Sequence, residues 1–194
     1  MNQNQDGSVT RRSFLRATTA AVSAAAVAPL EIGRAAWAAG SDTIRLGMIG
    51  CGGRNTGAAG QALTADKGVK LVAMCDVLKD RVEDKHDQLK KSKPDQVDVP
   101  QERQFWGFDG YKKVIECVDA VVIANAAKFH PLHAMAAIQA GKHVFVEKPH
   151  GIDPRGIKTM RAVCELAKRK KLCVVSGLHS RHHPGYQETI RRVH

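Results

Sequence analysis

The sequence feature that most constrains the fold is a glycine-rich turn that directly follows a short apolar run. Residues 43–49, Thr-Ile-Arg-Leu-Gly-Met-Ile, have the composition of a buried strand, and residues 50–55 form the turn. The segment after the turn is rich in alanine and contains Leu63, which predicts a helix. A strand, a glycine turn and a helix in this order are the context that a dinucleotide-binding loop requires.

Each position of the turn has a physical role in this interpretation. Gly50 can adopt the backbone angles of a tight turn, and Gly52 has no Cβ to keep a pyrophosphate away from the main chain. The helix that follows offers free N–H groups and the positive end of its dipole. The fingerprint has a third glycine where this chain has Asn55, and Gly53 and Gly57 can compensate. We predict cofactor contacts from the whole turn: Gly50, Cys51, Gly52, Gly53, Arg54 and Asn55.

A second apolar run, residues 69–75, ends at Asp76. The fingerprint places an acidic residue at the end of the second strand, where it accepts hydrogen bonds from the adenosine ribose. A carboxylate at this position repels the 2′-phosphate of NADP, so we predict NAD as the cofactor. NADP is the alternative, because Lys79 and Arg81 lie nearby in the sequence. The competing interpretation is a glycine-rich turn with no ligand and a solvated Asp76.

Length and composition limit the function classes that remain. A chain of 194 residues is long enough for one sizeable core. The net charge is +11, but aromatic residues make up only 5% and the basic residues are scattered, so we expect a solvated basic surface and no nucleic-acid site. The five cysteines include no Cys-x-x-Cys pair, and we interpret them as small apolar residues.

Residues 1–38 have the features of an export signal. Residues 10–16, Thr-Arg-Arg-Ser-Phe-Leu-Arg, match the twin-arginine signal closely, and residues 36–38, Ala-Trp-Ala, provide a cleavage site. The alanine-rich run between them is short and contains Pro29, which disfavours a membrane-spanning helix. We therefore predict that the twin-arginine export machinery carries the protein to the periplasm or the outside of the cell.

The rest of the chain alternates apolar strands with helices, which predicts an α/β fold with a doubly wound parallel sheet, the Rossmann arrangement. The uninterrupted apolar run at 120–124 is typical of a strand buried on both faces. The expected strands are about 43–49, 69–75, 104–106, 120–124, 143–146 and 172–176. The expected helices are about 55–66, 79–92, 108–116, 131–140 and 154–170.

Residues 141–149, Gly-Lys-His-Val-Phe-Val-Glu-Lys-Pro, resemble the signature of the glucose–fructose oxidoreductase and inositol dehydrogenase superfamily (Gfo/Idh/MocA). The apolar strand at 121–124 and the His-Pro-Leu-His segment at 130–133 resemble the fourth strand and the following helix of that family. The resemblance implies a Rossmann cofactor domain and a C-terminal α/β substrate domain. It also implies oxidation or reduction of a small-molecule sugar or polyol with a tightly held nicotinamide cofactor.

A parallel sheet gathers its ligand at the carboxyl ends of its strands. Lys148 follows one such end, and its ammonium beside the reacting carbon can stabilise an oxyanion that develops on the substrate. We therefore predict Lys148 as the catalytic residue. The family usually has Thr-Pro where this chain has Asn125-Ala126, so Asn125 is assigned through its hydrogen-bonding side chain. The strand ends and the resemblance together predict further cofactor contacts at Ala124, Asn125, His130, Glu147, Lys148 and Arg181.

Histidines at metal-ligand spacing occur at 130 and 133 and at 179, 182 and 183, but no carboxylate or thiol completes a tetrahedral set. We therefore predict no metal site. The expected domains are an export signal (1–38), a dinucleotide-binding domain (39–178), and a crossover with the start of a substrate domain (179–194). Because the substrate domain of the family follows this crossover, we expect the chain to be a fragment of a longer reading frame or a truncated product.

Three functions remain open at this stage. The first is an exported NAD(P)-dependent sugar or polyol oxidoreductase, of which this chain is the nucleotide-binding domain. The second is an NAD-dependent glycosidase of the same superfamily, a branch that typically departs from Glu-Lys-Pro. The third is a dinucleotide-binding fragment without catalytic activity. We also expect the full-length protein to form a homo-oligomer.

Overall fold

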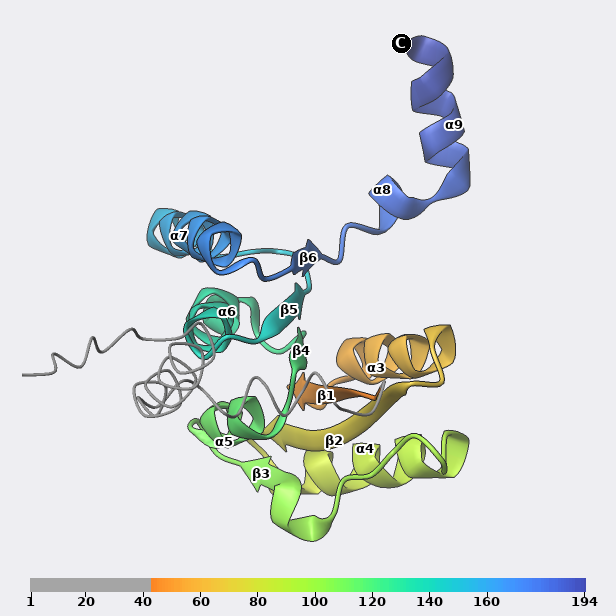
Figure 1. Ribbon diagram of the computed structural model, residues 1–194, viewed down its shortest axis with the longest axis vertical. Coiled ribbons are helices and arrows are strands. Elements are labelled where there is room, and N and C mark those ends of the chain that lie inside the picture. The colour runs from red at the N-terminus through yellow and green to blue at the C-terminus, as the bar shows by residue number, and fades with distance from the viewer. Residues whose placement is uncertain (1–42) are drawn as a thin grey trace, which may run out of the picture. The chain divides into compact units, whose positions relative to one another are not determined.

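A computed structural model describes residues 43–194 as a parallel β-sheet with helices on both faces (Figure 1). The predicted export signal, with Arg11 and Arg12, lies outside these residues. The sheet has six strands in the order β3-β2-β1-β4-β5-β6, and every pair is parallel. The strand order therefore reverses between β1 and β4, which confirms the predicted doubly wound sheet and creates a switch point for ligand binding.

The predicted strands and helices are all present, with small shifts at their ends. The strands are β1 Ile44–Ile49, β2 Val69–Asp76, β3 Gln104–Trp106, β4 Ala120–Ile123, β5 His143–Val146 and β6 Val174–Ser176. The helices are α3 Gly53–Ala65, α4 Lys79–Ser92, α5 Gly110–Cys117, α6 His130–Gln139, α7 Pro154–Lys170, α8 His179–His182 and α9 Pro184–Val193. Two short 3₁₀ turns, η1 Gln101–Arg103 and η2 Ala127–Phe129, precede β3 and α6.

The last strand begins later than predicted because helix α7 ends in a left-handed turn. Lys171 has φ 56°, and the Leu172 N–H donates to the Ala167 carbonyl over 2.9 Å. This arrangement satisfies the carbonyl groups at the helix end. Leu172 therefore belongs to the end of α7, and β6 starts only at Val174.

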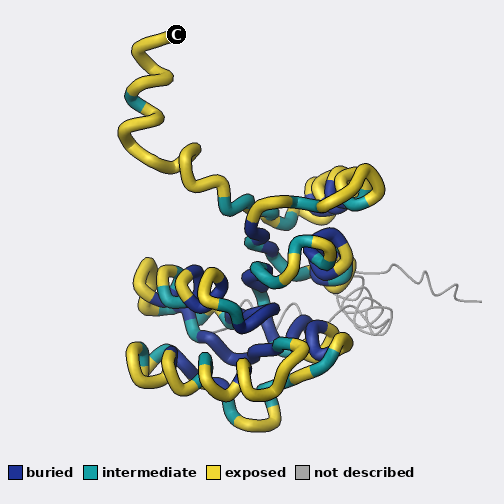
Figure 2. Tube along the Cα trace, turned by 180° about the vertical axis from the view of Figure 1, so that it is seen from behind, coloured by how far each residue is buried: buried dark blue, intermediate teal, exposed yellow. Residues whose placement is uncertain are grey.

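The core lies on both faces of the sheet because consecutive strand residues point in opposite directions. In β1, Met48 and Ile49 are 0% and 1% exposed, and they belong to different apolar clusters. One cluster joins the sheet to α5, α6 and α7, and the other joins it to α3 and α4. Figure 2 shows the buried strands between exposed outer helix faces. Because these strands are buried on both faces, the loops at their carboxyl ends start from a rigid base.

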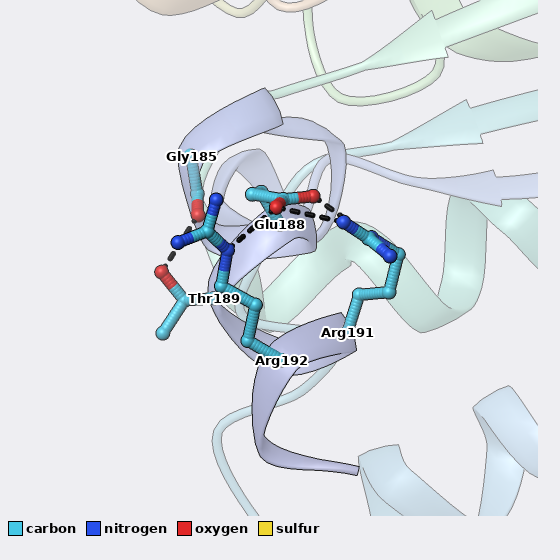
Figure 3. Close-up of polar contacts among 5 residues, drawn as sticks. All are labelled: Gly185, Glu188, Thr189, Arg191 and Arg192. Carbon is cyan, nitrogen blue, oxygen red and sulfur yellow. Dashed lines mark hydrogen bonds and ion pairs between the residues drawn. The ribbon is translucent and has the colours of Figure 1, made fainter.

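Helices α8 and α9 follow β6 and are exposed along most of their length (Figure 2). Within α9 the Glu188 carboxylate accepts hydrogen bonds from Arg191 and Arg192, and the Thr189 hydroxyl donates to the Gly185 carbonyl (Figure 3). The hydrogen bonds from Arg191 are the main cause that lowers the pKa of Glu188, and the bond from Arg192 lowers it further. These contacts link residues one helical turn apart, so they support the helix locally. Among residues 43–194, no helix is long and apolar enough to cross a membrane.

The turn after β1 requires glycine at position 50. Gly50 has φ +94°, and a Cβ there would lie 2.6 Å from the Asn125 Cβ and 2.9 Å from its Cα. We predict that Gly50→Ala lowers the free energy of unfolding by at least about 2 kcal/mol, because backbone strain and overpacking each cost roughly 1–3 kcal/mol. Urea denaturation measures the change. Gly53→Ala is the control, since no atom lies within 4 Å of its Cβ position. Equal unfolding midpoints for the two variants would contradict the prediction.

Candidate functional site

The glycine turn lies where the carboxyl ends of β1, β2 and β4 meet. The Gly50 N–H donates to the Cys75 carbonyl over 2.8 Å, which fixes the turn beside the end of β2. The missing Cβ of Gly50 allows Asn125, just after β4, to approach from the other side. At Gly52 and Gly53, apart from the adjoining residues and the backbone of α3 itself, no heavy atom lies within 4 Å of the position that a Cβ would take. The main chain of the turn is therefore open to a ligand.

The N-terminus of α3 provides a site for an anion beside this turn. No side chain caps the helix, and its first turn contains no acidic residue. The first hydrogen bond of the helix runs from the Thr56 N–H to the Gly52 carbonyl over 3.0 Å. The N–H groups of Gly53, Arg54 and Asn55, which precede Thr56 in the helix, are left for a ligand, and the helix dipole favours negative charge. This arrangement fits the pyrophosphate of a dinucleotide.

Asn55 supports the turn from below. Its side chain is 0% exposed, and its amide nitrogen lies 2.9 Å from the Ile49 carbonyl, 2.8 Å from the Gly50 carbonyl and 3.2 Å from the Val122 carbonyl. Asn55 therefore joins the ends of β1 and β4 where the fingerprint has its third glycine. The sequence predicted Asn55 as a cofactor contact, and the structure directs its side chain into the protein. The replaced glycine was the signal for this role, but its hydrogen-bond partners are not visible in the sequence.

Asp76 lies at the end of β2 and accepts two main-chain hydrogen bonds. The Cys51 N–H donates to its Oδ2 over 2.7 Å, and the Leu78 N–H donates to its Oδ1 over 3.2 Å. The carboxylate is thereby oriented beside the glycine turn and is only partly buried. Each carboxylate oxygen has a further lone pair for the ribose hydroxyls of a dinucleotide.

The two cysteines beside this carboxylate are structural. Cys51 is 1% exposed and Cys75 is 3% exposed, and the Cys51 thiol lies 3.5 Å from the Cys75 carbonyl. Burial raises the pKa of Cys51 far above its ordinary value and that of Cys75 to about 12. Both therefore stay as thiols at neutral pH. Cys51 serves the site through its main-chain N–H.

A cleft of about 600 Å³ opens beside Asp76 and the glycine turn. Its volume lies in the range of small-molecule sites, about 300–1,000 Å³. Asp109 and Arg81 also line it. Apolar side chains form much of its wall, namely Val77, Leu78, Phe108, Phe129 and Leu132. An adenosine fits such a cleft because its base is largely apolar on its faces and its ribose needs an acceptor. Sequence reasoning missed this wall because its side chains come from separate segments of the chain.

His130 connects the loops that follow β4 and β5. Its ring is 1% exposed, with Nδ1 2.8 Å from the Pro149 carbonyl and Nε2 3.0 Å from the Asn125 carbonyl. The sequence predicted His130 as a cofactor contact. In the structure, both ring nitrogens face main-chain oxygens.

Ala124 lies beside the glycine turn, where its N–H donates to the Ile49 carbonyl over 3.4 Å.

His133 lies one helical turn further along α6 and contacts the side chain of Asn125. The Asn125 Nδ2 and the His133 Nδ1 are 3.1 Å apart. Burial is the main cause that lowers the pKa of His133 to about 4, and the nearby His130 lowers it further. The ring is therefore neutral at neutral pH and accepts the amide hydrogen of Asn125. The Asn125 Oδ1 is buried without a partner among residues 43–194.

Glu147 and Lys148 follow β5 and lie in contrasting environments. Glu147 is 4% exposed and forms an ion pair with Arg54, while its Oε2 accepts the Lys148 N–H over 3.3 Å. The Lys148 side chain is exposed, and within residues 43–194 its ammonium has neither a hydrogen bond nor an ion pair. The Lys148–Pro149 peptide bond is cis. The ammonium is thus available to a ligand at the carboxyl edge of the sheet.

The structure brings together most of the predicted site. The glycine turn, Asp76, Asn125 and the Glu147–Lys148 pair all lie at the carboxyl edge of the sheet. Arg181 is different, because it is exposed on α8, after β6. No contact in the described part of the chain joins its side chain to the glycine turn. Residues 43–194 also contain no group of three or more potential metal ligands.

Comparisons with known proteins agree with this geometry. Residues 44–178 match the model of the GFO_IDH_MocA family, described as an oxidoreductase family with an NAD-binding Rossmann fold. The chain belongs to the Gfo/Idh/MocA family. It is therefore an NAD-binding Rossmann domain, which confirms the predicted cofactor class.

Curated relatives include two kinds of enzyme. A "Glycosyl hydrolase family 109 protein 1" of Bacteroides fragilis is 35% identical over 111 residues, which cover 56% of this chain and 23% of that protein. An "Inositol 2-dehydrogenase/D-chiro-inositol 3-dehydrogenase" of Halalkalibacterium halodurans is 32% identical over 153 residues, which cover 78% of this chain and 40% of that protein. The chain therefore spans well under half the length of these relatives.

Solved structures show the same fold. The apo scyllo-inositol dehydrogenase of Lactobacillus casei is similar with a TM-score of 0.62 and 25% identity, over 79% of this chain and 41% of that one. The same enzyme with bound NAD(H) and scyllo-inositol is similar with a TM-score of 0.60 and 25% identity, over 78% and 41%. A nicotinamide dinucleotide is thus the cofactor of a close structural neighbour.

The carboxylate of Asp76 predicts a preference for NAD. We expect the protein to bind NADH more tightly than NADPH, because the carboxylate repels the 2′-phosphate. Asp76→Asn keeps an acceptor for the Cys51 N–H but removes the charge, so the ratio of the two dissociation constants falls by about tenfold. Nicotinamide fluorescence titrations measure both constants. Arg81→Gln serves as the comparison, because loss of this cation should weaken the binding of NADPH and leave the binding of NADH unchanged. Equal or tighter NADPH binding by the unmodified protein would refute the preference.

Proposed function

We propose that this chain is the cofactor-binding part of a nicotinamide-dependent dehydrogenase that acts on a sugar or polyol. The observation that carries the proposal is the exposed ammonium of Lys148 at the carboxyl end of β5, with no partner among residues 43–194. The inositol dehydrogenases among its relatives support a polyhydroxylated substrate. Because the chain spans less than half of these proteins, the activity is proposed for the full-length protein.

The residues of the site divide the work of such a reaction. A bound nicotinamide would supply the hydride acceptor for such an oxidation. The amide groups at the start of α3 hold the pyrophosphate, and Asp76 accepts hydrogen bonds from the adenosine ribose. The Lys148 ammonium donates a hydrogen bond to the substrate oxygen and stabilises the negative charge that grows there as the hydroxyl proton passes to solvent water. His130 and Asn125 keep the neighbouring loops in place.

A glycosidase that uses its nicotinamide for transient oxidation is the second candidate. The 35% identity to a glycosyl hydrolase family 109 protein favours it. The intact Glu147-Lys148-Pro149 motif favours the dehydrogenase, because the glycosidase branch typically departs from it. Release of a chromogenic aglycone by the full-length protein would support the glycosidase. Reduction of NAD by a free polyol would support the dehydrogenase.

A third candidate is a dinucleotide-binding module without turnover. This candidate concerns the 194-residue chain taken alone, whose matched segments cover 23% and 40% of the two relatives. We expect this chain to bind NADH tightly without oxidising a polyol. Oxidation of the polyol by the full-length protein would then separate the binding module from the dehydrogenase. The homo-oligomer expected for the full-length protein stays a prediction, which sedimentation velocity tests.

The catalytic role of Lys148 is tested by substitution in the full-length protein. We expect Lys148→Ala to lower kcat by about 10²–10³, because one preorganised donor to a developing oxyanion is worth that much. The dissociation constant of NAD should change less than about threefold, since the turn and Asp76 bind the cofactor. Steady-state kinetics on the polyol substrate and a parallel NAD titration provide the measurement.

Lys148→Arg is the matched variant that keeps the positive charge. It should lose almost as much activity, because the planar guanidinium is larger and places its donors differently from the compact ammonium. If Lys148→Ala instead keeps kcat within about threefold and weakens NAD binding, Lys148 is a cofactor anchor and the catalytic assignment is wrong.

We also propose that the protein leaves the cytoplasm by the twin-arginine route. The support is the match at residues 10–16 and the Ala-x-Ala site at 36–38. Replacement of both Arg11 and Arg12 by lysine should leave the precursor in the cytoplasm, whereas Arg16→Lys should be exported normally. Cell fractionation and immunoblotting measure the distribution. A processed double variant outside the cytoplasm would rule out this route.

A further inference from the structure

Glu147 is a buried carboxylate that contacts two other segments and the next residue of its own segment at the carboxyl edge of the sheet. Its Oε1 pairs with the Arg54 guanidinium at the start of α3, and its Oε2 accepts the Lys148 N–H over 3.3 Å. It also packs against Gly177 after β6, where an added Cβ would overlap both carboxylate oxygens. A carboxylate that is 4% exposed is stable only with a charged partner. Arg54 is that partner.

Arg54 occupies an unusual place for a cation. It is the second residue of α3, where the helix dipole opposes positive charge, and the first turn contains no acidic residue. Glu147 supplies one compensating charge from a different element. The Arg54 side chain is still 51% exposed, and its ion pair with Glu147 engages a single nitrogen, Nη2. A guanidinium has five N–H donors in a rigid fork, so several remain for a second anion.

The second anion expected at this helix end is the pyrophosphate of the cofactor. We propose that Arg54 bridges the pyrophosphate and Glu147, and that this bridge transmits occupancy of the glycine turn to the main chain of Lys148. Arg54 and Glu147 are then positioning residues. The Glu147 Oε2 accepts a hydrogen bond from the Lys148 N–H, and this hydrogen bond is most stable when the cofactor holds Arg54. Because Lys148 is the proposed catalytic residue, the benefit of this coupling rests on the proposed function.

The coupling can be measured on this chain without any turnover. ADP is the probe, because it carries the adenosine and pyrophosphate but no nicotinamide that could cover Lys148 directly. Hydrogen exchange followed by mass spectrometry reports the amides of the turn and of residues 147–150 in separate peptides. We expect saturating ADP to slow exchange of both peptides by at least about threefold in the unmodified protein.

The decisive variant replaces both charges at once, Arg54→Met with Glu147→Gln. Removing both partners leaves no buried charge unpaired, so the fold is retained. We expect ADP to bind up to about tenfold more weakly and, at saturation, to protect the turn as before. Protection of residues 147–150 should be lost. Arg54→Lys, which keeps the charge but not the fork, should lose part of that protection.

Glu188→Gln is the matched control, since Glu188 also pairs with arginines but lies on α9 (Figure 3). It should leave both responses to ADP unchanged. The coupling is overturned if ADP fails to protect residues 147–150 in the unmodified protein, or if the double variant retains that protection. A loss of ADP affinity above about 100-fold would assign Arg54 to the cofactor alone and overturn it as well. None of these outcomes depends on whether the full-length protein oxidises a polyol.

Discussion

The structure depends on how the central strands end. The last carbonyl groups of a buried parallel strand need donors, because an unpaired polar group inside a protein costs about 1–3 kcal/mol. Here the Asn55 amide lies within 3.2 Å of carbonyl oxygens of Ile49, Gly50 and Val122, at the ends of β1 and β4. One side chain thereby closes the strand ends and shapes the turn above them. Because Asn55 contacts the turn from below, the upper face of the turn is free to bind an anion.

The charges around the turn follow from the same arrangement. Asp76 is held by two main-chain N–H groups beside the turn, which suits it to accept from hydroxyl groups and to repel a phosphate. The first amides of α3 and the half-exposed Arg54 guanidinium are the positive groups at the start of that helix. In the proposed function the negative group would meet the ribose and the positive groups the pyrophosphate, so their separation would orient the cofactor as well as bind it.

The sequence predicted the fold and the main binding loop because both depend on local patterns. Apolar runs of strand length and a glycine turn between a strand and a helix are visible without tertiary contacts. The functions of Asn55 and His130 were not visible, since each depends on carbonyl groups of other elements. The apolar wall with Phe108 and Phe129 also required the folded structure, because its members are distant in sequence. Sequence reasoning thus identified side chains at the site, but not which of them face inward.

Lys148 combines a free side chain with a fixed backbone. Its ammonium has no partner among residues 43–194, so its side chain is not fixed by contacts of its own. Its backbone is fixed instead: the Glu147 N–H donates to the Ile123 carbonyl over 2.9 Å, and the next N–H donates to the Glu147 carboxylate. A donor that must bond to a substrate cannot be committed to the protein beforehand. Positioning through the backbone and through Glu147 therefore holds the main chain of Lys148 in place while leaving the hydrogens of its ammonium available to a ligand.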